Sequence, residues 1–249
     1  MKNLFIISVY CILFTFTACS KGDYYQSKTL RVMDYNVRNC KGSDDNVNYN
    51  RIAKVISQYS PDVVAIQELD SVTTRHNTYV LGVLANLTGM HDYFAPALNY
   101  KGGKYGLGIL SKESALSMNY YPLPGSEEAR VILIVEFENF YFACTHLSLT
   151  EADQIASANK IQNIFAPLGK PVILAGDFNA RPDSECIHAF EKFCTPISDM
   201  NLFTFPASEP NSCIDYIFTT ESSVKSKNFN VINEPQASDH RPLFVEVEL

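Results

Sequence analysis

Short apolar runs alternate with amphipathic segments along most of this chain, and the alternation predicts strands and helices. Residues 63–66 and 171–175 are apolar at every position, which is typical of strands covered on both faces. Residues 50–59 instead place Ile52, Val55 and Ile56 at helical spacing. The predicted strands cover residues 30–37, 63–66, 91–95, 107–110, 131–137, 140–145, 171–175, 214–218, 224–231 and 243–249, and the predicted helices cover residues 50–59, 79–88, 150–168 and 183–193.

Hairpins and strand–helix units both occur in this order. A short Glu138-Asn139 turn joins two of the strands, whereas a helix separates the strands at 30–37 and 63–66. Such a mixture predicts an α/β (α+β) domain, in which two mixed sheets pack face to face and carry helices on their outer faces. Residues 99–105, rich in glycine, lysine and tyrosine, are predicted to form a loop. The sequence contains no internal repeat or linker, so residues 29–249 are predicted to form one domain.

The N-terminal segment has the layout of an export signal. Lys2 supplies a positive charge, residues 4–17 are an apolar run, and Ala18-Cys19-Ser20 follows. The run is short for a membrane-spanning helix, and small residues before a cysteine resemble the bacterial lipoprotein signal. We therefore expect a signal peptide over residues 1–18, lipidation of Cys19 and a polar tether over residues 19–28. Plain secretion and an uncleaved anchor helix are the alternatives.

A lipid anchor at Cys19 would place the protein in the bacterial cell envelope. The expected site is the outer membrane, with the domain facing the periplasm or the cell surface, tethered to a membrane that it does not span.

Charge and cysteine content change this picture only slightly. The formal net charge of −7 disfavours a protein that grips nucleic-acid backbone nonspecifically, although one local basic rim would suffice for a nuclease. Of seven cysteines, setting aside Cys11 and Cys19 leaves five, so at least one thiol stays outside any intrachain disulfide. No Cys/His spacing of a zinc site is present in the sequence, and we expect neither a zinc finger nor a catalytic cysteine.

Polar and titratable residues occur at or just past the ends of several apolar runs. They are Asn36, Glu68, His146, Asp177, Asn179, Asp215, Asp239 and His240. Strand ends that meet at one edge of a sandwich can assemble a single active site. Carboxylates and amides suit a hard divalent cation, and a histidine paired with a carboxylate can act as acid, base or phosphate-binding cation. The set therefore predicts metal-assisted chemistry on a phosphate.

Each of these residues also has an ordinary alternative. Asn36 and the Asp177/Asn179 pair fit turns, and Glu68 fits a solvated strand end. If the chain stays extended after the strand, Asp177 and Asn179 point to the same face. A lone histidine such as His146 is more often structural, so the prediction depends on the joint occurrence of the set.

Three arginines are further candidates, because a guanidinium can bind the substrate phosphate. They are Arg38, Arg75 and Arg130. For Arg130, which begins a predicted strand, a structural carboxylate is an equally suitable partner.

Nine segments resemble the endonuclease/exonuclease/phosphatase superfamily, whose fold is the DNase I-like fold. In chain order they are MDYNVR, VVAIQELD, YGLGILSK, ARVILIVEF, ACTHLSL, VILAGDFNA, FTFP, CIDYIFTT and SDHRPL. The resemblance covers nearly all of residues 30–249. It implies a four-layer α-β-β-α sandwich and hydrolysis of a phosphate ester that depends on Mg²⁺ or Mn²⁺.

The resemblance also implies roles for the candidate residues. Glu68 would be the principal metal ligand, with Asn36 and Asp239 beside it, and His146 would contact the phosphate. The acid/base and phosphate-orienting roles would fall to Asp177, Asn179, Asp215 and His240. Either Asp177 or His240 would activate the attacking water.

Two positions depart from the abasic-site repair branch of the superfamily. That branch carries an acid where this chain has Arg38, and a tyrosine and an asparagine around Thr145-His146-Leu147. The THL form is similar to the sphingomyelinase, inositol-phosphatase, deadenylase and DNase I branches. We therefore expect a phosphoesterase, in particular a phosphodiesterase, rather than a repair enzyme.

The substrate class stays open at the level of sequence. A lipid head group, a nucleotide, a sugar phosphate and nucleic acid are all compatible with the set, and no obligate protein partner is indicated. The rival hypotheses are a nonspecific secreted nuclease and a noncatalytic binding module on the same fold.

Overall fold

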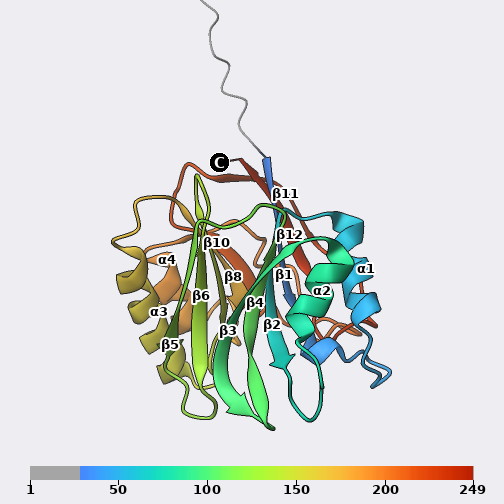
Figure 1. The fold of residues 1–249 in the computed structure, drawn as a ribbon. Helices are drawn as coiled ribbons and strands as arrows, with labels where there is room; N and C mark the ends of the chain where they lie inside the picture. The colour runs from blue at the N-terminus through green and yellow to red at the C-terminus, as the bar shows by residue number, and fades with distance from the viewer. Residues whose placement is uncertain (1–28, 249) are drawn as a thin grey trace, which may run out of the picture.

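A computed structural model describes residues 29–248, which form two six-stranded sheets packed face to face (Figure 1). The strands of the first sheet are β1 (Thr29–Asn36), β2 (Val63–Ser71), β3 (His91–Tyr100), β4 (Gly103–Ser111), β11 (Lys225–Val231) and β12 (Leu243–Glu248). The strands of the second sheet are β5 (Ser117–Leu123), β6 (Arg130–Glu136), β7 (Tyr141–His146), β8 (Val172–Asp177), β9 (Thr195–Pro196) and β10 (Asp215–Thr219). Their orders are β11-β12-β1-β2-β4-β3 and β5-β6-β7-β8-β10-β9. Both sheets are mixed, because β1 pairs with β2 and β7 with β8 in parallel while the other pairs are antiparallel.

Helices cover the outer face of each sheet (Figure 1). They are α1 (Tyr49–Tyr59) and α2 (Val80–Thr88) on the first sheet, and α3 (Glu151–Phe165) and α4 (Glu185–Glu191) on the second. The side chain of Asn48 caps α1 by accepting a hydrogen bond from the Arg51 amide, and Gly89 ends α2 with a φ of 70°. The predicted four-layer α-β-β-α sandwich of the DNase I-like type is confirmed.

The alternation of side chains along the strands builds three apolar layers. In β1, Leu30 and Val32 pack between the two sheets, whereas Met33 and Tyr35 pack under α1 and α2. Strands covered on both faces need apolar residues at nearly every position, which accounts for the continuous apolar runs in the sequence.

The structure differs from the predicted strands and loops at residues 99–105 and at β5. Residues 99–105 are not a loop, because Lys101 and Gly102 form a tight turn with positive φ and the flanking residues pair as β3 and β4. β5 was missed because it is an edge strand whose side chains are mostly exposed on both faces. β5 is defined by its pairing with β6, and its residues show no alternation of apolar and polar positions in the sequence.

The cysteines of the described domain are all buried free thiols. Within residues 29–248 no helix combines the length and the apolar character that a membrane span requires. The signal peptide over residues 1–18, the lipidated Cys19 and the tether lie outside the described residues. They stay predictions, which metabolic labelling of Cys19 with a fatty acid would test.

Candidate functional site

Three of the predicted residues form a row across the second sheet. The register pairs His146 of β7 with Asp177 of β8, and Asp177 with Asp215 of β10. Two positions earlier on β7 and β8, Cys144 and Ala175 belong to the core between the sheets. Because side chains alternate along a strand, His146 and Asp177 also face the opposite sheet.

Asn36 joins this row to the first sheet. Its side-chain amide nitrogen donates to Glu68 Oε1 at 3.1 Å and to Asp177 Oδ2 at 3.0 Å. The side-chain oxygen of Asn36 accepts from the backbone amide of Arg38 at 3.1 Å, which fixes the orientation of the amide group. One buried amide therefore ties together two carboxylates from different sheets.

A β-bulge directs Glu68 into the site. The pairing of β2 with β4 shifts between Ile66 and Leu69, and Glu68 has a φ of 61°. Ile66 and Leu69 both pack on the helix side of the sheet, so the two residues between them, Gln67 and Glu68, are both placed toward the opposite sheet. The strand does not end at Glu68 as predicted but continues to Ser71.

His240 lies beside two carboxylates. Its Nδ1 is 2.9 Å from Asp215 Oδ2, and its Nε2 is 3.7 Å from Asp177 Oδ2. The ring of Phe205 packs on the imidazole, with 4.8 Å between the ring centroids. The Ser238 hydroxyl donates to the backbone carbonyl of Asn36 at 2.8 Å, which anchors the loop that carries His240 to β1.

The surroundings of His240 favour its charged form. Burial disfavours the charge, but the carboxylates of Asp215 and Asp177 outweigh it and raise the pKa of His240 to about 10. The raised pKa makes His240 an imidazolium at neutral pH in the metal-free protein.

This pKa predicts how the stability of the metal-free protein depends on pH. The stabilisation from charged His240 is complete below the ordinary pKa of 6.5 and is lost as the pH rises through about 10. The loss should be on the order of a few kcal/mol in the free energy of unfolding. Urea unfolding between these pH values, with a chelator present, should show a decline that His240→Gln lacks. His188→Gln, which alters an exposed histidine on α4, is the matched control and should retain the decline; parallel profiles for wild type and His240→Gln would contradict the prediction.

His146 differs from His240 in its charge. Its Nε2 is 3.5 Å from Asp177 Oδ2, and burial, together with the nearby guanidinium of Arg130, lowers the pKa of His146 to about 4. At neutral pH, in the metal-free protein, His146 is therefore neutral and His240 is cationic, although both imidazoles lie near Asp177.

Asn179 does not adopt the extended conformation that was one of the two alternatives for it. Its φ is 50°, and its backbone amide donates to Asp177 Oδ1 at 2.9 Å, as in an Asx turn. The Asn179 side-chain amide donates to the Leu147 carbonyl at 3.0 Å. The turn alternative is thus correct for the backbone, and Asn179 orients one oxygen of Asp177.

Asp239 and Arg38 lie together at the more exposed side of the site. Arg38 Nε is 3.4 Å from Asp239 Oδ2, and the Ser238 hydroxyl is 3.3 Å from Asp239 Oδ1. About a third of each of the two charged side chains is exposed, so either could also meet a ligand.

The other two candidate arginines already have carboxylate partners. Arg75 binds Asp70 through Nε and Nη2, both at 2.8 Å. Arg130 lies within 3.4 Å of Glu127 and 3.3 Å of Glu128, so the structural carboxylate considered for it is present. These ion pairs fix the positions of the two arginine side chains. A phosphate-binding role for either arginine stays a prediction.

Two groups of side chains could hold a metal ion. The first is the predicted one, Glu68, Asn36 and Asp239. The carboxylates of Asp239 and of the neighbouring Asp177 lie near enough to Glu68 to act on its pKa. Burial raises the pKa of Glu68, these two charges raise it further, and the Asn36 amide lowers it. The second is Asp177, Asp215 and His240, whose ligand atoms all lie within 4.8 Å of one another.

The donor atoms favour the first group for Mg²⁺, which prefers oxygen ligands and one or two carboxylates. In the second group the His240 Nδ1 is already bonded to Asp215.

Asp34 lies beneath the site and is not among the residues predicted from the sequence. Burial and the charge of Asp215 raise the pKa of Asp34 well above its usual range. Gln67 Nε2 donates to Asp34 Oδ1 at 2.8 Å and contacts the sulfur of Cys144 at 3.4 Å. The signal in the sequence was an acid at an inward position of β1, between Val32 and Asn36.

The family model described as the Endonuclease/Exonuclease/phosphatase family matches residues 35–240. A mannosyl-6-phosphatase of Bacteroides thetaiotaomicron superposes with a TM-score of 0.71 at 21% identity, over 88% of this chain and 100% of that one. The human nocturnin catalytic domain, solved with a bound sulfate anion, superposes with a TM-score of 0.68 at 19% identity, over 88% and 93% of the two chains. At these identities the structures support the fold.

A sequence relative from Caenorhabditis elegans, itself uncharacterised, is 26% identical over 153 residues. The matched region is 61% of this chain and 45% of that protein, so the chain spans less than half the length of this relative.

Proposed function

The chain belongs to the endonuclease/exonuclease/phosphatase family, and from that premise we propose that it hydrolyses a phosphate ester with the help of Mg²⁺ or Mn²⁺. The observation that carries the proposal is the position of the Asn36 amide, which bonds to both Glu68 and Asp177 between the sheets. His240, bound to Asp215, completes the same cluster.

The residues that would hold the ion are Glu68, Asn36 and Asp239. Glu68 and Asp239 supply two carboxylates, which fit a hard divalent cation, and Asn36, whose amide nitrogen faces Glu68, would add its oxygen once the amide group turns over. A bound divalent ion would neutralise charge on the phosphoryl oxygens and make water a better nucleophile.

Asp177 is the residue best placed to accept a proton from the attacking water. Its Oδ1 is fixed by the Asn179 amide, while its Oδ2 lies among Asn36, His146 and His240. In the metal-free protein the Asp215 and Asp177 carboxylates outweigh burial and raise the pKa of His240 to about 10, and this preference for the charged form favours Asp177 over His240 as the base. The attacking oxygen would bond to phosphorus in line with the leaving oxygen, whose bond to phosphorus breaks.

The two histidines would act on the phosphoryl group itself. Cationic His240, held by Asp215, would pair with a phosphoryl oxygen as negative charge develops, and neutral His146 would donate one hydrogen bond. Phe205 packs on His240 and limits the positions that its ring can take.

A panel of phosphomonoesters and phosphodiesters, assayed with the purified protein and Mg²⁺ or Mn²⁺, tests this proposal. Sugar phosphates belong in the panel because a mannosyl-6-phosphatase shares the fold, and plasmid DNA and RNA belong in it because a nuclease is the main alternative. We expect turnover of at least one ester that a chelator abolishes and added Mg²⁺ or Mn²⁺ restores. A protein that hydrolyses none of them would fit the noncatalytic binding module instead.

A further inference from the structure

Two side chains of β1 hold the bulge that turns Glu68 into the site. Asp34 and Asn36 continue the series of inward positions along β1 and lie two residues apart. Asn36 donates to the carboxylate of Glu68 at 3.1 Å, and Asp34 accepts from the side-chain amide of Gln67 at 2.8 Å. Each of the two bulge residues therefore has its own partner on the neighbouring strand.

The conformation of the bulge needs this support. Glu68 has a φ of 61°, a region that residues other than glycine rarely adopt. A strand without the bulge would direct Glu68 to the helix side of the sheet, away from Asn36. A side chain that fixes Gln67 therefore also fixes the direction of the carboxylate that follows it.

Gln67 is fully buried between the sheets and is held from three directions. Besides its bond to Asp34, its Nε2 contacts the sulfur of Cys144 on β7 at 3.4 Å, and its backbone oxygen accepts from the Val37 amide at 3.4 Å. Asp34 is buried as well. A hydrogen bond in such surroundings is electrostatically stronger than one exposed to water.

Packing alone does not explain a polar pair at this depth. Val32, Ala65 and Leu243 of the same layer are apolar. Among residues 29–248 the Oδ2 of Asp34 and the Oε1 of Gln67 have no hydrogen-bond partner. An apolar pair of similar size would avoid the cost of burying these atoms, so a role in the site explains the pair better than stability does.

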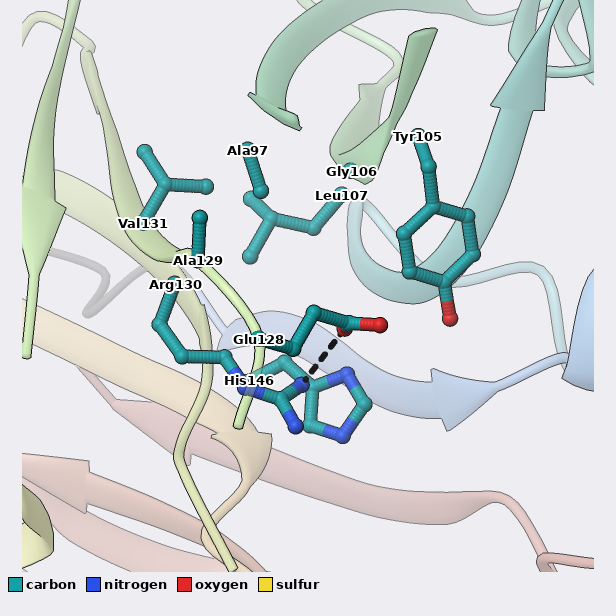
Figure 2. Close-up of a pocket in the computed structure, with 9 residues that line it drawn as sticks. All are labelled: Ala97, Tyr105, Gly106, Leu107, Glu128, Ala129, Arg130, Val131 and His146. Atoms are coloured by element: carbon teal, nitrogen blue, oxygen red, sulfur yellow. Dashed lines mark ion pairs between the residues drawn. The ribbon is translucent and has the colours of Figure 1, made fainter. Parts of the chain in front are cut away.

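The opposite side of Glu68 offers no comparable support. Burial raises the pKa of Tyr105 and the charge of Glu68 raises it further, so the two groups are near each other, yet within residues 29–248 no hydrogen bond joins them. The Tyr105 phenol instead lines a small pocket with Glu128 and His146, which has room for at most one water (Figure 2). Glu68 is therefore held from the β1 side.

We propose that Asp34 is a positioning residue of the metal site, which fixes the bulge at Glu68 through its hydrogen bond to Gln67. The inference rests on the proposed metal-dependent function, in which Glu68 is the principal ligand. Without the acceptor on Asp34, the buried Gln67 amide would turn to find another partner, and Glu68 would point toward the ion less often. Removing partners behind the ligands of a metal site typically costs about 10–100-fold in metal affinity or activity.

An electrostatic effect on the site is the alternative role for Asp34. Burial raises the pKa of Asp34 and the charge of Asp215 raises it further, so the two carboxyl groups lie near each other. Asp34→Asn and Asp34→Ala both remove the acid, but asparagine keeps an oxygen that can accept from Gln67. The positioning role therefore predicts different results for the two variants, and the electrostatic role predicts the same result.

Calorimetric titration of the full chain with Mn²⁺, in the absence of substrate, tests the proposal. In Asp34→Ala we expect the Kd for Mn²⁺ to rise by about tenfold or more, with a fall of similar size in kcat/KM for the best ester. In Asp34→Asn both quantities should stay within about twofold of the wild-type values, because the hydrogen bond is kept.

A second variant probes the same bond from the other side and serves if Asp34→Ala does not fold. Gln67→Met keeps the length of the side chain, removes the amide and should weaken Mn²⁺ binding as Asp34→Ala does. The double variant should bind Mn²⁺ no more weakly than either single variant, because all three break one interaction. Val135→Ala on β6 is the matched control, since it removes buried volume from the same layer far from the bulge and should lower stability without changing the Kd.

The outcomes separate the inference from the proposed function. Equal weakening in Asp34→Asn and Asp34→Ala, a wild-type Kd in Gln67→Met, or weakening in Val135→Ala as large as in Asp34→Ala would overturn the positioning role while leaving the phosphoesterase function intact. A wild-type protein that neither binds Mn²⁺ nor hydrolyses any ester would overturn the proposed function, and the inference with it.

Discussion

Replacing His240 with alanine is expected to lower kcat/KM for the best ester substrate by about 10²–10⁴-fold, the range typical of a positioned acid/base or charged group in an active site. The variant removes the imidazolium that would pair with a phosphoryl oxygen. It also leaves Asp215, a buried carboxylate, without its 2.9 Å partner. Initial rates at saturating Mg²⁺ or Mn²⁺ measure the effect.

Two further variants separate catalysis from folding. His188→Ala, on the exposed side of α4, should retain the wild-type rate. Asp215→Asn should lower the rate in the same direction as His240→Ala, because it removes the charge that holds the imidazole in place and stabilises its protonated form. A rate near the wild-type value in a folded His240→Ala protein would remove His240 from the mechanism.

The period-two alternation of strands made much of the site predictable. Asn36, His146 and Asp177 each continue the inward series of an apolar strand, so their shared direction follows from counting residues. The parallel pairing of β7 with β8 then sets His146 opposite Asp177. The direction of a polar side chain at the end of a buried strand can therefore be predicted without knowing which strand pairs with it.

The position of Glu68 did not follow from counting. Strict alternation from Ile66 would place Glu68 on the helix side, and only the bulge against β4 reverses that outcome. A bulge depends on how two strands match in length and register, which no local pattern along β2 records. The positive φ of Glu68 is likewise a tertiary effect, since glutamate has no intrinsic preference for that region.

Charge pairing was the other feature hidden from the sequence. Arg75 and Arg130 were candidates for phosphate because a guanidinium can bind one, yet Asp70, Glu127 and Glu128 already neutralise them. Those acids lie within five residues of their partners in the chain, so local spacing could have suggested the pairs. Local spacing could not have shown, however, that Glu128 also lines a pocket.

Replacing Glu68 with alanine is expected to abolish metal-dependent turnover while leaving the domain folded. Glu68 is the one acid of the predicted metal group that the first sheet itself supplies, and burial together with the charges of Asp239 and Asp177 makes it costly to ionise without a cation. Removing it relieves that repulsion, so the metal-free variant should unfold at a temperature close to that of the wild type.

The metal response distinguishes a lost ligand from a lost fold. An ion that binds only the folded state raises the unfolding temperature, so added Mg²⁺ or Mn²⁺ should stabilise the wild type and should not stabilise Glu68→Ala. Glu191→Ala on α4 is the matched control and should respond as the wild type does, because Glu191 is an exposed acid outside the site. If Glu68→Ala kept both the metal-linked rise in unfolding temperature and the turnover, Glu68 could not be the principal metal ligand. The metal site to test would then be Asp177, Asp215 and His240, because their ligand atoms lie within 4.8 Å of one another.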